Sequence, residues 1–130
     1  MRREIVIHAL AHARAALAAA AARGIPVTLA SAPGAALQTG PAWFKAVIDQ
    51  AGEEHPAVAV TAILDCGDQP GAAMAALRLG LKDLRFHGAA ELRSKLEGMG
   101  AVLALPAGSV LDLRAVAEPE VACAAFLRQS

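Results

Sequence analysis

The chain has 130 residues, which is the size of one domain with a single hydrophobic core and too short for two. Its 12 lysines and arginines balance 12 aspartates and glutamates and are scattered, which excludes the basic patch of a nucleic-acid-binding or membrane-surface protein. Hydrophobic residues make up 56% of the chain. Because one small monomer does not easily bury so much apolar surface, we expect a homodimer or a larger homo-oligomer.

Cysteine usage and the apolar segments predict a cytoplasmic location. The two cysteines, Cys66 and Cys123, are too few for a disulfide framework, which is typical of a reducing compartment. Near the N-terminus, Glu4 and His8 interrupt the apolar stretch that a signal peptide would need. The longest apolar run, residues 15–22, reaches at most about half of a membrane span, so we expect no membrane contact.

Strand-like and helical segments alternate along the whole chain, which predicts a single α/β domain over residues 1–130. Five strands are expected at residues 4–8, 27–31, 58–64, 84–87 and 101–105. Helices are expected at residues 10–23, from Pro41, after Asp68, around 92–99 and at 119–129. Residues 106–118 give no clear signal. The segment 58–64 is apolar on both faces, which predicts a central strand with helices on both sides of the sheet.

The helix that begins at Pro41 contains the only tryptophan. Its apolar side chains recur at helical spacing and predict a face toward the core, formed by Phe44, Val47, Ile48 and Ala51. Trp43 falls beside this stripe rather than within it. We therefore expect Trp43 to form part of a subunit interface or a pocket wall, with packing against the loop before it as the alternative.

Five strands in a chain of this length predict a three-layer sandwich with a mostly parallel sheet, of the flavodoxin-like kind with strand order 2-1-3-4-5. A Rossmann-like order, 3-2-1-4-5, is the alternative. In the first arrangement the strands at 4–8 and 58–64 are neighbours. His8 and Asp65 would then lie close together at the carboxyl edge of the sheet, where open α/β sheets bind their ligands.

The turn Asp65-Cys66-Gly67-Asp68 ends the most apolar strand and is the strongest local signal. One interpretation is structural, with Asp68 capping the next helix and Asp65 accepting hydrogen bonds from the turn. Cys66 is either a nucleophile at a helix N-terminus or a small buried residue. An aspartate here resembles the phosphorylated residue of receiver domains. The acidic pair and the lysine that those domains need are missing after the first and fifth strands, which argues against that activity.

Three histidines, His8, His12 and His87, fall at or just after the predicted carboxyl ends of strands. Together with Asp65 they predict acid–base chemistry, for which we select His8, Asp65 and His87 as candidate catalytic residues. A mixed histidine, cysteine and aspartate metal site is a weaker alternative. The pair at His8 and His12 crosses a strand-to-helix junction instead of lying on one helix face, so we predict no metal site.

The connection at residues 31–40 is longer than the usual strand-to-helix loop, and long loops at this edge are commonly functional. It contains glycines and precedes a helix N-terminus, an arrangement that favours binding of an anion. It matches neither the dinucleotide-binding nor the P-loop pattern, so no cofactor is assigned. The candidate ligand-binding residues are Ser31, Gly34, Gln38, Thr39 and Asp68.

Two functional hypotheses remain, of which the sequence favours the first, and the second is the alternative. The first is a cytoplasmic, homo-oligomeric binding module for a protein partner or a small anionic ligand. The second is a small, metal-independent enzyme that uses histidine and aspartate for acid–base chemistry. Convergence of His8, Asp65 and His87 in one site favours the enzyme, whereas side chains that point apart or bond only to the backbone favour the binding module.

Overall fold

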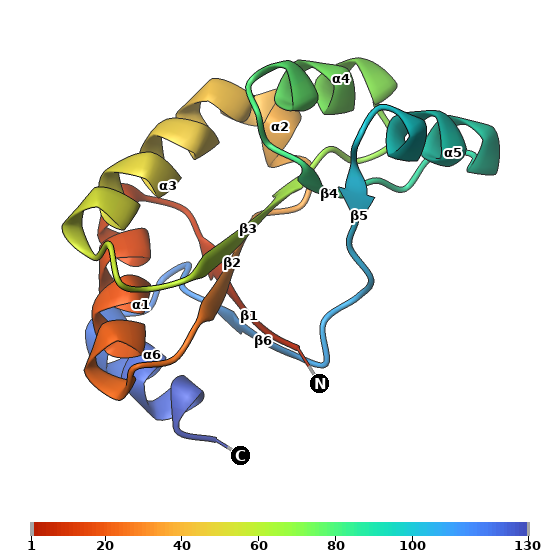
Figure 1. Ribbon diagram of the computed structural model, residues 1–130. Coiled ribbons are helices and arrows are strands. Elements are labelled where there is room, and N and C mark those ends of the chain that lie inside the picture. The colour runs from red at the N-terminus through yellow and green to blue at the C-terminus, as the bar shows by residue number, and fades with distance from the viewer. Residues whose placement is uncertain (1, 130) are drawn as a thin grey trace.

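The computed structural model describes residues 2–129, in which six helices and six strands alternate (Figure 1). The strands are β1 (Arg3–Ile7), β2 (Val27–Ser31), β3 (Val60–Asp65), β4 (Asp83–Arg85), β5 (Val102–Leu103) and β6 (Ser109–Asp112). The helices are α1 (Leu10–Arg23), α2 (Ala35–Gln38), α3 (Pro41–Glu54), α4 (Pro70–Arg78), α5 (Ala90–Gly98) and α6 (Pro119–Leu127). No helix among the described residues is both long and apolar enough to cross a membrane.

The expected α/β fold of the flavodoxin and Rossmann kind is confirmed, with an all-parallel sheet and β3 among its inner strands. The sheet has six strands rather than five, because β6 forms within the unassigned segment 106–118. Its order is β5-β4-β3-β2-β1-β6, so both expected strand orders are wrong. Each of the first five strands is added beside the previous one, whereas both expected orders reverse direction next to β1.

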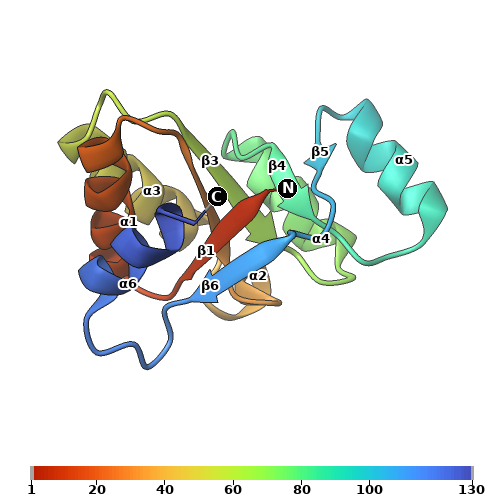
Figure 2. The same ribbon diagram turned by 90° about the horizontal axis from the view of Figure 1, so that it is seen from below.

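Helices pack on only one face of this sheet within the described residues. Parallel connections are almost always right-handed, so successive steps in one direction place their helices on the same side. Accordingly, Ile7, Leu29 and Leu64 share one core with residues of the helices. Figures 1 and 2 show the helices in one row around the outside of the curved sheet. The expectation of helices on both faces is therefore corrected.

The opposite, inner face of the sheet has its own small cluster, formed by Val6, Ala30 and Ile63. Ala104, in the connection from β5 to β6, packs against this cluster. All three cluster residues are at most 9% exposed although no helix covers them. The curvature of the sheet and the returning connection thus replace the helical layer that a sandwich would have on this face.

Helix α1 has the expected bounds and lies between α3 and α6 in the helical layer. Its alanines allow close approach, and Ala13, Ala16 and Ala20 are fully buried. The helix ends at Gly24, whose φ of 64° is the left-handed conformation that glycine adopts most easily. Trp43 on α3 is half-buried and packs against the core, while its predicted role in an interface stays a prediction.

Candidate functional site at the carboxyl edge of the sheet

Asp65 ends β3 and is 5% exposed. Its Oδ1 accepts hydrogen bonds from the backbone N–H groups of Gly34, at 3.1 Å, and Gly67, at 2.9 Å. Both glycines have positive φ, 69° and 57°, which other residues rarely adopt. Asp65 therefore ties the loop after β2 to the turn after β3, and the expected hydrogen bonds to the turn are present.

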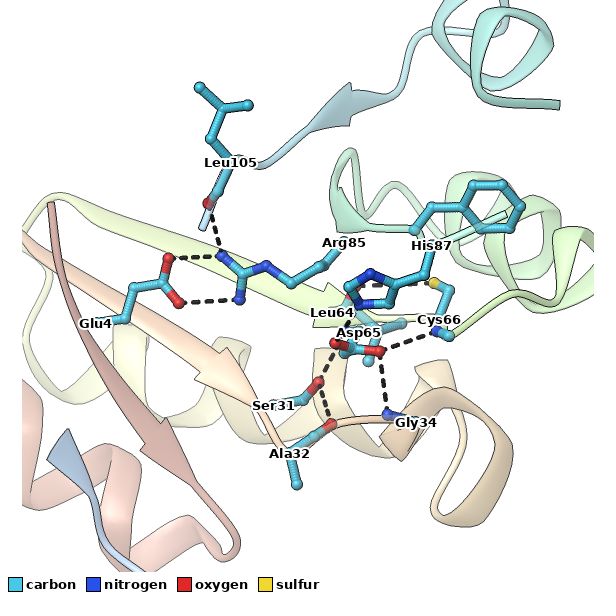
Figure 3. Close-up of polar contacts among 12 residues, drawn as sticks. Glu4, Ser31, Ala32, Gly34, Leu64, Asp65, Cys66, Arg85, His87 and Leu105 are labelled. Carbon is cyan, nitrogen blue, oxygen red and sulfur yellow. Dashed lines mark hydrogen bonds and ion pairs between the residues drawn. The ribbon is translucent and has the colours of Figure 1, made fainter. Parts of the chain in front are cut away.

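His87 follows β4 and brings an exposed imidazole to the same carboxylate. Its Nε2 lies 3.4 Å from Oδ2 of Asp65, and the side chains of the two residues are 60% and 7% exposed, respectively. The backbone N–H of His87 donates to the carbonyl of Gly67 at 2.7 Å, which holds the ring over the turn. Figure 3 shows the ring beside Asp65. The structure thus places two of the three candidate catalytic residues in one cluster.

The hydroxyl of Ser31 supports Asp65 from the end of β2. Its Oγ accepts a hydrogen bond from the backbone N–H of Asp65 at 2.8 Å and donates to the carbonyl of Ala32 at 3.3 Å. Ser31 is 4% exposed. Because the hydroxyl proton bonds to a backbone carbonyl, the geometry gives Ser31 a structural role in the loop rather than that of a nucleophile.

Cys66 is fully buried next to Asp65, and its Sγ contacts the carbonyl of Leu64 at 3.8 Å. Burial raises the pKa of the Cys66 thiol to about 11, and the charge of Asp65 acts in the same direction. A thiol with this pKa remains protonated at neutral pH. The structure therefore favours the buried structural cysteine over the nucleophile.

His8 lies apart from this cluster. Strand β2 separates β1 from β3, so the expected close pairing of His8 with Asp65 is wrong. Instead, Nε2 of His8 lies 2.6 Å from Oδ1 of Asp112 at the end of β6. Partial burial acts to raise the pKa of Asp112. The backbone hydrogen bond from Arg114 and the contact with His8 outweigh it and lower that pKa.

His12, on the first turns of α1, completes this second cluster. The backbone N–H of His8 donates to Nδ1 of His12 at 2.9 Å, and the two rings meet edge to face at 5.8 Å between centroids. Burial, followed by the nearby His8, lowers the pKa of His12. Its ring is therefore neutral at pH 7, with the lone pair on Nδ1 and the proton on Nε2.

The remaining candidate ligand residues lie on the same edge but form few contacts. Gln38 and Thr39 are exposed at the end of α2, where Oγ1 of Thr39 donates to the carbonyl of Ala35 at 3.1 Å. Asp68 is exposed and accepts only from the side chain of Gln69, at 3.0 Å. The expected cap from Asp68 to α4 is wrong. Pro70 occupies the start of that helix, so the cap position falls on Gln69.

A buried ion pair lies on the inner face of the sheet, close to Asp65. The guanidinium of Arg85 donates to both carboxylate oxygens of Glu4, at 3.0 and 2.7 Å, and also to the carbonyl of Leu105 at 3.0 Å (Figure 3). The hydrogen bonds to Glu4 raise the pKa of Arg85, and the charge of Asp65 adds to this effect.

Sequence reasoning missed three residues that the structure places near the site, Glu4, Arg85 and Asp112. Glu4 could have been found because it directly precedes the apolar run at residues 5–7 of its strand, and Arg85 because it stands between two apolar residues, Leu84 and Phe86. Asp112 lies in the unassigned segment. Its apolar neighbours Val110, Leu111 and Leu113 were the available signal for a short strand there.

The edge of the sheet therefore presents two histidine–aspartate pairs, His87 with Asp65 and His8 with Asp112. Each pair joins residues that are far apart in the sequence, and each combines a carboxylate acceptor with an imidazole that has two distinct ring nitrogens. Within residues 2–129, no three histidine, cysteine, aspartate or glutamate side chains are grouped so as to hold a metal ion. The chain matches no protein-family model and no curated protein sequence.

Proposed function

We propose that the protein is a small enzyme that transfers protons on a polar ligand at the carboxyl edge of its sheet, with His87 as the proton acceptor. One observation carries this proposal: an exposed imidazole is paired with a buried carboxylate, His87 with Asp65. A carboxylate that orients a histidine leaves the other ring nitrogen available to the ligand, which is the arrangement of a general base.

In this proposal each ring nitrogen of His87 has its own role. An ionised carboxylate only accepts hydrogen bonds, so Nε2 carries the proton toward Asp65 and Nδ1 keeps its lone pair. Among the described residues, Nδ1 has no hydrogen-bond partner. It would take a proton from a ligand hydroxyl or an attacking water, and Asp65 would stabilise the imidazolium until the proton is returned. General-base catalysis of this kind accelerates reactions by about 10²–10⁴-fold.

The charges at this edge favour a neutral or cationic ligand over the anionic ligand that the loop glycines suggested. The N–H of Gly34 already donates to Asp65, so it is not free to bind an anion. Asp65, Asp68 and Asp112 all lie at the carboxyl ends of strands or in the turns that follow them. Exposed Gln38 and Thr39 on the same loop remain candidate ligand contacts.

A ligand screen tests the proposal. Ligand-detected NMR with matched sets of neutral, cationic and anionic small molecules should give hits in the neutral or cationic set. Their affinity should fall in both His87→Ala and Asp65→Asn. His55→Ala is the matched control, because His55 lies at the C-terminal end of α3, at the opposite edge of the sheet. Equal ligand affinities in the wild type and the three variants would show that the ligand does not bind at this edge.

Self-association in the cytoplasm is a second proposed property, as the apolar composition suggested. Support comes from the large hydrophobic side chains left exposed on the single chain, which are Leu37, Met74, Leu79, Met99, Val102, Leu105, Val110 and Val121. Two buried free cysteines fit a reducing compartment. Sedimentation velocity over the micromolar range should detect a dimer or larger oligomer, and a monomer at every concentration would overturn this part of the proposal.

A further inference from the structure

An apolar groove lies between α4 and α5 on the outer, helical side of the molecule. It has a volume of about 540 Å³ and is lined by Pro70, Met74, Leu92, Lys95, Leu96 and Met99. Met74 and Met99 are 37% and 51% exposed. Methionine side chains are flexible and polarisable, so grooves that contain them adapt well to an apolar helix.

Helix α5 is the most weakly packed of the long helices around the sheet. Leu96 is its one buried residue, whereas α1 buries five. Figures 1 and 2 show α5 at the end of the row of helices, beyond α4. The row therefore ends at a helix whose apolar stripe, Leu92, Leu96 and Met99, lines the open groove.

We propose that two copies of this chain associate through this surface, with α5 of one copy packed antiparallel against α5 of the other across a two-fold axis. The proposal rests on the self-association proposed above and assigns its surface and symmetry. Met99 of each copy would then lie beyond the start of the other α5, at the Pro70 end of the other groove. A two-fold contact of this kind uses the same patch on both copies, so it closes at the dimer.

Charge complementarity selects a second copy as the occupant and fixes the direction of its helix. Lys95 lines the groove, and Glu91 lies one turn before it on the same side of α5. Both are exposed and form no ion pair within the described residues. Because the two helices run in opposite directions, Glu91 of each copy lies toward Lys95 of the other. A parallel arrangement would instead place like charges side by side.

The size of the surface predicts a weak dimer. Helix α5 has nine residues and is therefore only about 14 Å long. A contact centred on it is expected to be smaller than the roughly 800 Å² per partner of a standard interface. We therefore expect a dissociation constant in the micromolar range, with monomer and dimer in equilibrium.

The first test replaces an apolar contact. Met99→Asp should weaken dimerisation about tenfold or more in sedimentation velocity, because it buries a charge in the proposed contact. Val121→Asp on α6 is the matched control, since Val121 is 63% exposed and lies at the other end of the row of helices. If Met99→Asp dimerised as strongly as the wild type, the interface would lie elsewhere, and only the proposal of self-association would stand. A monomeric wild-type protein would overturn both proposals.

The second test exchanges charges and checks the symmetry. Glu91→Lys alone and Lys95→Glu alone should each weaken the dimer, because each sets like charges opposite one another. The double variant Glu91→Lys/Lys95→Glu should restore it. An equimolar mixture of the two single variants should form heterodimers, since every contact then joins opposite charges. No change in either single variant, or no rescue by the double variant and the mixture, would overturn the antiparallel arrangement.

Discussion

Arg85 on β4 forms two parallel hydrogen bonds with Glu4 on β1, although β3 and β2 lie between these strands in the sheet. In a flat sheet, three steps of about 4.8 Å would separate the two strands by about 14 Å. The curvature of the sheet toward its inner face brings the two side chains together across this distance. Glu4 is 1% exposed, so the pair closes the inner face beneath the carboxyl edge.

Replacing only one member of this ion pair should strongly destabilise the protein. Arg85→Met leaves Glu4 buried without a counter-charge, and such changes lower the free energy of unfolding by about 3–5 kcal/mol. Glu4→Leu combined with Arg85→Met removes both charges and should recover most of the loss. Urea unfolding followed by circular dichroism measures each variant.

An exposed ion pair provides the control for this experiment. Arg14 and Glu54 pair at 2.8 Å, but their side chains are 48% and 33% exposed, so Arg14→Met should change the free energy of unfolding by less than about 1 kcal/mol. Similar losses of unfolding free energy in Arg85→Met and Arg14→Met would contradict the conclusion that Glu4 is buried and needs Arg85 as its counter-charge.

Asp65 has a structural and a chemical role, which two substitutions separate. Asparagine keeps an oxygen that accepts from Gly34 and Gly67, so Asp65→Asn should retain most of the stability, whereas Asp65→Ala leaves both N–H groups without a partner and should lower it by about 2 kcal/mol. Both variants remove the negative charge beside His87. NMR of the imidazole nitrogens should therefore show loss of the preferred Nε2–H form in each.

Asp68 is the matched control for Asp65, because it lies in the same turn but is exposed and caps no helix. Asp68→Ala should change the free energy of unfolding by no more than about 0.5 kcal/mol. A loss near 1 kcal/mol would instead indicate a capping interaction with α4 in solution.

The sequence predicted most elements but not their order in space. Periodicity and cap residues located α1 and α3 with the observed start points, because these signals act over a few residues. The order of strands depends on which neighbour each strand packs against, and alternating elements are compatible with several orders. The missing β6 shows the same limit, since Val110 is half-exposed and the strand is too short for a continuous apolar run.

The candidate site was predicted in part for the same reason. Asp65 ends β3 and His87 follows the neighbouring strand β4, so any order that keeps these strands adjacent brings the two residues together. The pairing of His8 depended on the position of β1. Since β1 lies between β2 and β6, His8 meets Asp112, a residue that no local pattern linked to it.

Cys66 should be unreactive in the folded protein at neutral pH. Its thiol is fully buried and burial raises its pKa to about 11, so both access and thiolate formation are suppressed. Iodoacetamide labelling followed by peptide mass spectrometry should modify Cys66 only after unfolding in urea. Cys123 has a similar pKa and burial, and serves as an internal comparison. Rapid labelling of Cys66 alone would indicate that the turn after β3 opens in solution.

His12 should make the protein less stable as the pH falls below neutral. The pKa of His12 is lower in the folded protein than its ordinary value of 6.5, so the unfolded chain binds a proton first as the pH decreases. Its contribution to stability is therefore present above pH 6.5 and is lost as the pH falls through the folded pKa.

His12→Gln cannot titrate, so its free energy of unfolding should vary less than that of the wild type between about pH 7 and pH 5. Urea unfolding across this interval measures both slopes, with His55→Gln as the control for a histidine at the opposite edge of the sheet. Parallel slopes in wild type and His12→Gln would show that His12 titrates alike in the folded and unfolded chains, and would contradict its assignment as a neutral, hydrogen-bonded ring.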